Sequence, residues 1–141
     1  MNDSSNDLLG KVIGIALTAH AGQFRRDGVT PYFRHPMAVA DRVAKYGHEY
    51  VYVAYLHDVL EDVNMGLIQD FYDLGIPENI ITAVILLTKH KGVNYDDYLK
   101  NIKSNELARR VKIADMLSNL ADDPTDKQIV KYAKGLTYLM E

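Results

Sequence analysis

The sequence lacks cysteine and has no excess of positive charge. Among its 141 residues, the absence of cysteine excludes a disulfide scaffold, a thiolate metal site and a cysteine nucleophile, and it agrees with a reducing compartment. The 16 Lys and Arg residues are outnumbered by 19 Asp and Glu residues, which gives a net charge of −3. Because a protein that binds the DNA backbone broadly needs a basic face, we expect no nucleic-acid partner.

Long apolar runs and a secretory signal are also missing. The longest apolar stretch, residues 80–87, is far shorter than the roughly 20 residues that a membrane-spanning helix needs. The first residues, MNDSSND, are polar and acidic, without the cationic start and apolar block of a signal peptide. With 48% hydrophobic and 25% charged residues, the composition is that of a globular protein. We therefore expect one domain over residues 1–141, located in the cytoplasm and without membrane contact.

The periodicity of the apolar residues is helical almost throughout. Ser, Thr, Asp and Asn favour helix starts and glycine favours helix ends, so these residues divide the pattern into segments. We expect a helix from cap residues 4–7 to Gly22, a loop over Gln23–Tyr32, and helices over 36–46, 48–62, 66–74, 77–87, 95–102, 105–120 (capped by Ser104) and 125–141. Since strand signals are weak, the sequence predicts an all-α bundle of about seven or eight helices.

Four titratable residues follow one another closely inside an apolar segment. His57 and Asp58 are followed by Glu61 and Asp62. On a helix, residues three and four positions apart lie on the same face, so these side chains would crowd one helix end. Their negative charges would repel one another unless a cation held them. A solvent-exposed helix end is the alternative interpretation.

Two further residues, His35 and Asp115, complete a candidate metal site. His35 precedes Pro36, which favours an extended backbone at His35 and leaves its ring at a helix start. Asp115 lies on an apolar helical stripe, where a carboxylate is costly unless it pairs with a cation. Two His and two Asp residues suit Mn²⁺, Fe²⁺ or Zn²⁺ better than Ca²⁺. Alternatively, Asp115 pairs with Lys112 or Arg110.

Three sequence blocks resemble the alarmone-hydrolase branch of the HD-domain superfamily. The first has AHAGQ at residues 19–23, RR at 25–26, PY at 31–32 and HP at 35–36. The second is LHDVLED at residues 56–62. The third is VKIAD at 111–115, followed by Leu117 and Asn119. The blocks stand in the expected order and together cover most of the chain.

The resemblance implies an HD-domain helical bundle and hydrolysis of ppGpp or pppGpp at the 3′ position, which releases pyrophosphate and GDP or GTP. By this resemblance, Glu61 and Asp62 are the residues that position and deprotonate the attacking water. The metal ion is usually Mn²⁺, and its ligands correspond to His35, His57, Asp58 and Asp115.

The resemblance also implies a nucleotide site. Arg25 and Arg26 match a basic pair that contacts the guanine nucleotide, one of them by stacking on the base. Asn119 matches a residue that contacts the ribose and phosphate region. Without the resemblance, the two arginines would be interpreted as part of an ordinary charged loop.

The chain departs from the family pattern in three places. Full-length members also carry synthetase and regulatory domains, for which 141 residues leave no room, so we expect a stand-alone hydrolase. The last block ends in Ser118-Asn119-Leu120-Ala121, where family members often have a His followed by Met-Arg. The segment between Lys89 and Ser104 is shorter than in the long enzymes.

Two other functions stay open from the sequence. The first is an HD phosphohydrolase for another ester, such as a nucleoside monophosphate, a cyclic nucleotide or the 2′-phosphate of NADPH. The second is a non-catalytic module that binds a nucleotide or neutralises a toxin. The oligomeric state is not indicated.

Overall fold

The computed structural model describes residues 3–61 and 67–141, and these residues form helices and no strand. Phe24 and Pro31 make only an isolated antiparallel bridge. The predicted all-α class is therefore confirmed. No described helix is long and apolar enough to cross a membrane. The helices are α1 (Asp3–Ala19), α2 (Arg34–Val43), the 3-10 turn η1 (Ala44–Tyr46), α3 (His48–Leu56), α4 (Leu67–Asp73), α5 (Glu78–Leu87), α6 (Tyr95–Lys103), α7 (Glu106–Leu120) and α8 (Asp126–Met140).

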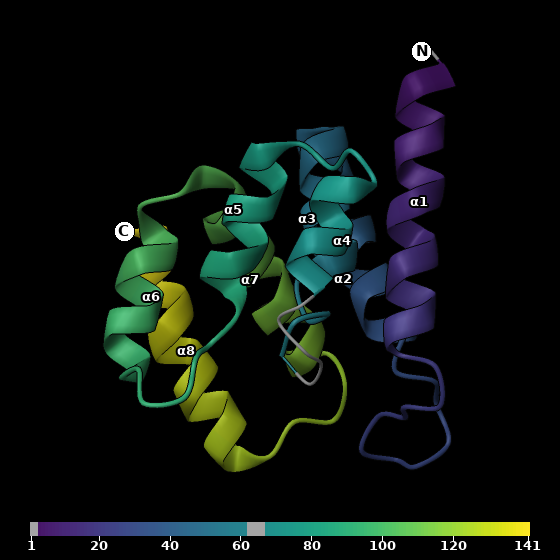
Figure 1. The fold of residues 1–141 in the computed structure, drawn as a ribbon. Coiled ribbons are helices and arrows are strands. Elements are labelled where there is room, and N and C mark those ends of the chain that lie inside the picture. Colours follow the sequence, from purple (N-terminus) through teal and green to yellow (C-terminus); the bar gives the residue numbers. More distant parts are fainter. Residues whose placement is uncertain (1–2, 62–66) are drawn as a thin grey trace.

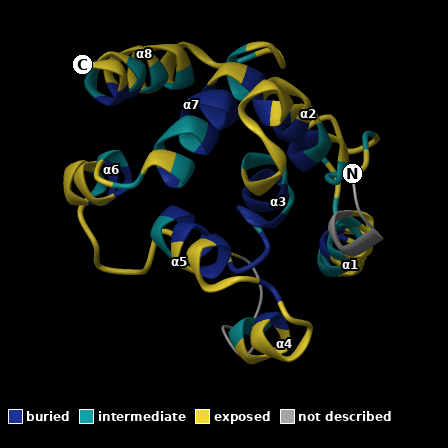
Figure 2. Ribbon diagram, turned by 90° about the horizontal axis from the view of Figure 1, so that it is seen from above, coloured by how far each residue is buried: buried dark blue, intermediate teal, exposed yellow. Residues whose placement is uncertain are grey.

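Helices α3 and α7 form the centre of the bundle. Helix α3 packs against α1, α2, α5 and α7, while α7 also contacts α2, α5, α6 and α8. Figure 1 shows α1 on one side of the molecule and α6 with α8 on the other. In the view from above, the buried residues face the space between α2, α3, α5 and α7 (Figure 2). The largest fully buried side chains are Phe71, Leu56, Ile80, Ile81, Ile102, Met116 and Leu139.

Side-chain caps set the starts of the last three helices. Asn94 accepts hydrogen bonds from two backbone N–H groups in the first turn of α6. Asn105 caps α7 in the same way, so the predicted cap, Ser104, is wrong by one residue. At α8, Thr125 and Gln128 bond each other's backbone in a reciprocal capping box. These local bonds explain why the helix starts could be predicted closely.

The helix predicted over residues 48–62 ends earlier than expected. Helix α3 stops at Leu56, tight turns follow, and Asp62 lies outside the described residues. The Nδ1 atom of His57 donates to the Ala54 carbonyl at 2.6 Å. A polar side chain that bonds a nearby backbone carbonyl competes with the helical ladder. The predicted boundary is therefore corrected: His57 is the first residue beyond α3, and it stands in a turn.

Candidate active site

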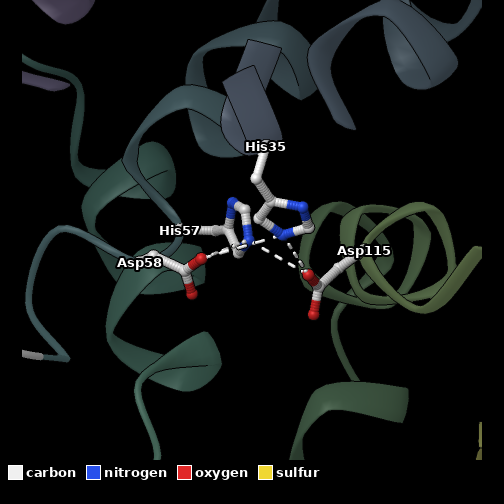
Figure 3. A group of neighbouring side chains, drawn as sticks. All are labelled: His35, His57, Asp58 and Asp115. Atoms are coloured by element: carbon white, nitrogen blue, oxygen red, sulfur yellow. Dashed lines mark hydrogen bonds and ion pairs between the residues drawn. The ribbon is translucent and has the colours of Figure 1, made fainter. Parts of the chain in front are cut away.

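Four side chains from distant parts of the sequence meet inside the bundle (Figure 3). His35 comes from the first turn of α2, His57 and Asp58 from the turns after α3, and Asp115 from α7. One potential ligand atom from each residue lies within 4.8 Å of those of the other three. We call these residues the His/Asp group. They are the four residues that the resemblance assigned to a metal ion.

His57 is oriented so that its Nε2 atom faces the two carboxylates. The hydrogen bond to the Ala54 carbonyl requires the proton to be on Nδ1, which leaves a lone pair on Nε2 in the neutral ring. Nε2 lies 3.1 Å from Asp58 Oδ2 and 3.4 Å from Asp115 Oδ1. It has no hydrogen-bond partner among the described residues. A buried lone pair beside two carboxylates is unfavourable unless a proton or a metal cation lies between them.

His35 contacts the same two carboxylates from the other side. Its Nε2 atom lies 2.7 Å from Asp115 Oδ1 and 3.8 Å from Asp58 Oδ2. Both histidines and Asp115 are buried. Two imidazole nitrogens and two carboxylate oxygens form a mixed donor set that suits divalent transition metals. The residues of the His/Asp group therefore fit a divalent metal ion.

The charges of the His/Asp group favour a cation. Burial alone would favour protonated carboxyls, but His57 lowers the pKa of Asp58 to about 2. Burial acts on Asp115 in the same direction, and Lys112 with the two histidines holds its pKa well below the usual value. Burial works against a charged His57, yet the charges of Asp58 and Asp115 raise its pKa well above the usual value. The group thus keeps two negative charges at neutral pH and attracts positive charge.

Three side chains outside the His/Asp group hold its carboxylates. The Tyr32 hydroxyl donates to Asp58 Oδ2 at 2.5 Å. The Lys112 ammonium donates to Asp115 Oδ2 at 2.9 Å, and Asn119 Nδ2 donates to Asp115 Oδ1 at 3.4 Å. No role was predicted for Tyr32, and Lys112 was predicted only as an alternative partner of Asp115. In the structure, the Lys112 pair and the His/Asp group exist together.

Glu61 is not part of the His/Asp group. Glu61 is exposed, and its Oε1 atom accepts a hydrogen bond from the Lys89 backbone N–H at 2.9 Å. Lys89 lies in the connection between α5 and α6, so this bond ties the turns after α3 to that connection. Asp62, the other residue expected to handle water, lies outside the described residues.

The two arginines are bonded to side chains at the end of α7, in the α7–α8 connection and at the start of α8. Arg25 donates to Asp122 Oδ2 from Nε at 3.0 Å and from Nη2 at 2.8 Å. The same Nη2 donates to Asn119 Oδ1 at 3.1 Å. Arg26 donates to Gln128 Oε1 at 3.2 Å. Neither arginine is therefore a freely solvated charge.

A cavity of about 240 Å³ adjoins these arginines. Two of its wall residues, Tyr32 and Asn119, contact carboxylates of the His/Asp group. The guanidinium carbon of Arg25 lies 5.6 Å from the centre of the Tyr32 ring. The cavity thus connects the arginines to residues that support the His/Asp group. Its lining consists of Phe24, Arg25, Arg26, Tyr32, Asn119, Asp122 and Gln128.

Comparison with known proteins finds relatives of the chain both in sequence and in structure. No protein-family profile matches the chain. Over 113 residues, the chain is 36% identical to a protein from Haemophilus influenzae named guanosine-3′,5′-bis(diphosphate) 3′-pyrophosphohydrolase. The match covers 77% of this chain but only 16% of that protein.

One structural relative is described as a metazoan orthologue of SpoT that hydrolyses ppGpp and plays a role in starvation responses. The two structures superpose with a TM-score of 0.77 at 23% sequence identity. The superposition covers 95% of this chain and 85% of that chain. The likeness shows that both chains share one all-α fold.

Proposed function

Because the chain belongs to the HD-type family of alarmone hydrolases, we propose that it hydrolyses ppGpp or pppGpp at the 3′ position. The products are pyrophosphate and GDP or GTP. The observation that carries this proposal is the His/Asp group, in which potential ligand atoms of two histidines and two aspartates lie within 4.8 Å of one another. The adjoining cavity with its two arginines supports a phosphorylated substrate.

In this proposal, His35, His57, Asp58 and Asp115 hold a divalent cation. Mn²⁺ is the proposed ion, and the same donor set also accepts Fe²⁺ or Zn²⁺. Such an ion supplies Lewis-acid chemistry, since it acidifies water and offsets negative charge on a phosphate. The hydrogen bond from His57 to the Ala54 carbonyl keeps Nε2 turned toward Asp58 and Asp115, so that it could serve as a ligand.

Glu61 is proposed to take the proton from the attacking water. A general base must come within hydrogen-bond reach of the proton that it takes, and a carboxylate can serve in this role. The Lys89 backbone N–H holds the Glu61 carboxylate in place through Oε1, and the residue is exposed to solvent. Asp62 is proposed to orient the same water, as the resemblance implies.

Arg25, Arg26 and Asn119 are proposed to bind the nucleotide. Asp122 and Asn119 hold the Arg25 guanidinium in a fixed plane. A planar guanidinium both stacks on a purine face and donates to phosphate oxygens. Asn119 also contacts Asp115, so one side chain joins the nucleotide site to the His/Asp group.

The deciding experiment is turnover of ppGpp by Mn²⁺-loaded protein, with EDTA-treated protein as the control. We expect metal-dependent release of pyrophosphate and GDP. Glu61→Gln should retain Mn²⁺ binding and lose turnover, because the amide cannot accept the proton. NADPH and GMP, tested alongside, report on the other phosphate esters. Activity on one of these with none on ppGpp would refute the proposal.

The remaining expectations are part of the same proposal. Residues 1–141 are proposed to act as a single hydrolase domain in the cytoplasm, with a guanine nucleotide as the partner and neither nucleic acid nor membrane. The other HD substrates and the non-catalytic module are not favoured, because the sequence relative carries the name of a ppGpp pyrophosphohydrolase.

A further inference from the structure

The two oxygens of the Asp115 carboxylate have different partners. Oδ1 faces the His/Asp group, 2.7 Å from His35 Nε2 and 3.4 Å from His57 Nε2. Oδ2 accepts from the Lys112 ammonium at 2.9 Å. A positive charge is therefore one carboxylate away from the place that a divalent cation would occupy.

The position of this ammonium is fixed by its surroundings. Lys112 stands three residues before Asp115 on α7, and only 14% of its side chain is exposed. Its Nζ atom also lies 5.5 Å from the centre of the Tyr98 ring. A charge held this way is screened less by solvent than a surface charge. Its effect on the His/Asp group should therefore be substantial.

We propose that the Lys112 charge makes the metal-loaded His/Asp group cationic. The positive group then attracts a phosphate anion, and the same charge lowers the affinity for the metal ion. With neutral histidines, the charges of Asp58 and Asp115 balance those of a divalent ion. The Lys112 ammonium then adds an uncompensated positive charge. The part of this inference that concerns the anion rests on the proposed function.

The sign of the effect on metal affinity follows from electrostatics. The ammonium repels a divalent cation and withdraws electron density from its carboxylate ligand, and both effects weaken metal binding. Without the ammonium, Asp115 still accepts the hydrogen bond from Asn119 Nδ2, which helps to keep the carboxylate in place. Removal of the charge should thus tighten metal binding, whereas loss of a residue that merely holds Asp115 should weaken it.

The first test compares Mn²⁺ affinities, measured from the electron paramagnetic resonance signal of the free ion without any nucleotide. Lys112→Met removes the charge and keeps the apolar stem, while Lys112→Gln removes the charge and keeps a donor. We expect both variants to bind Mn²⁺ at least about fivefold more tightly than the wild type. Lys112→Arg keeps the charge and should bind within about twofold of the wild type.

Lys103→Met is the matched control. Lys103 also lies over a tyrosine ring, with its Nζ atom 4.4 Å from the centre of Tyr138, so the change removes the same charge elsewhere. We expect its Mn²⁺ affinity to equal that of the wild type. Unchanged or weaker Mn²⁺ binding in folded Lys112→Met would overturn the proposal. If that variant does not fold, the same result for Lys112→Gln overturns it.

The second test addresses the anion. At saturating Mn²⁺, the KM for ppGpp should rise at least about fivefold in Lys112→Met and stay near the wild-type value in Lys112→Arg and Lys103→Met. An unchanged KM in Lys112→Met would overturn this part of the inference. A wild-type protein without ppGpp turnover would refute the proposed function instead, and the Mn²⁺ comparison would still decide the effect of the charge.

Discussion

Replacing Tyr32 with phenylalanine removes one hydroxyl group, and with it the hydrogen bond that this hydroxyl donates to Asp58. The hydroxyl donates to Asp58 Oδ2 at 2.5 Å. Burial and the charge of Asp58 raise the pKa of Tyr32 far above its usual value, so the phenol stays a donor at every physiological pH. The ring itself packs 4.8 Å from the His20 ring and 5.8 Å from the His35 ring, centre to centre. Phenylalanine retains these contacts, and the change isolates the hydrogen bond.

The expected loss follows from the charge of the acceptor. A hydrogen bond to a charged group contributes about 1.5–3 kcal/mol to stability. For Tyr32→Phe we therefore expect the free energy of unfolding of the metal-free protein to fall by about 2 kcal/mol, or a Tm lower by about 6 °C. Since Asp58 is a proposed ligand, Mn²⁺ affinity should fall about tenfold or more.

Urea unfolding of the metal-free protein and Mn²⁺ titration measure the two losses separately. Tyr95→Phe is the matched control, because the Tyr95 hydroxyl is buried without a hydrogen-bond partner among the described residues. That change breaks no hydrogen bond within the described part of the chain, so it should not lower the free energy of unfolding and should leave Mn²⁺ affinity unchanged. If Tyr32→Phe behaves like Tyr95→Phe in both measurements, the hydrogen bond does not support Asp58.

Arg25→Ala should raise the KM for ppGpp at least about tenfold with little change in Mn²⁺ affinity, and steady-state kinetics with an unchanged KM would refute its nucleotide role. Gly135→Ala should lower the free energy of unfolding by about 1 kcal/mol, because its Cβ would lie 2.7 Å from Met116 Cε. Gly14→Ala in the open part of α1 should instead raise it by about 0.5–1 kcal/mol in the same denaturation assay. Burial raises the pKa of Tyr98 to about 12. In the unfolded chain, Tyr98 loses its proton at a lower pH than in the folded protein. The free energy of unfolding should therefore fall by up to about 2.7 kcal/mol as the pH rises from about 10 to 12. This loss should be absent in Tyr98→Phe.

Most of the fold could be predicted because its boundaries are set by local chemistry. The caps Asn94 and Thr125 and the glycine Gly75 act within a few residues of their own positions, so the sequence shows them directly. The end of α3 was predicted wrongly for the opposite reason. Apolar periodicity continues past Leu56, but the His57 ring bonds the Ala54 carbonyl, and periodicity contains no information about that bond.

The candidate site could be predicted only in part from the residues themselves. A carboxylate at Asp115 on an apolar stripe and a histidine at His35 before a proline are each unusual, but 80 positions separate them. Only the packing of α2 against α7 makes them neighbours, and the resemblance supplied that information in advance. No role for Tyr32 could be predicted, because ordinary packing explains a tyrosine next to a proline equally well.

Tyr32 and Lys112 hold the two carboxylates in similar ways but should affect metal binding in opposite directions. Each donates one hydrogen bond to a carboxylate oxygen, at 2.5 Å to Asp58 and at 2.9 Å to Asp115. The phenol is neutral, so it orients its carboxylate without opposing a cation, and its removal should weaken Mn²⁺ binding. The ammonium carries a charge that repels the same cation, and its removal should strengthen Mn²⁺ binding. If both variants weaken it equally, support of the carboxylates by hydrogen bonds outweighs charge at this site.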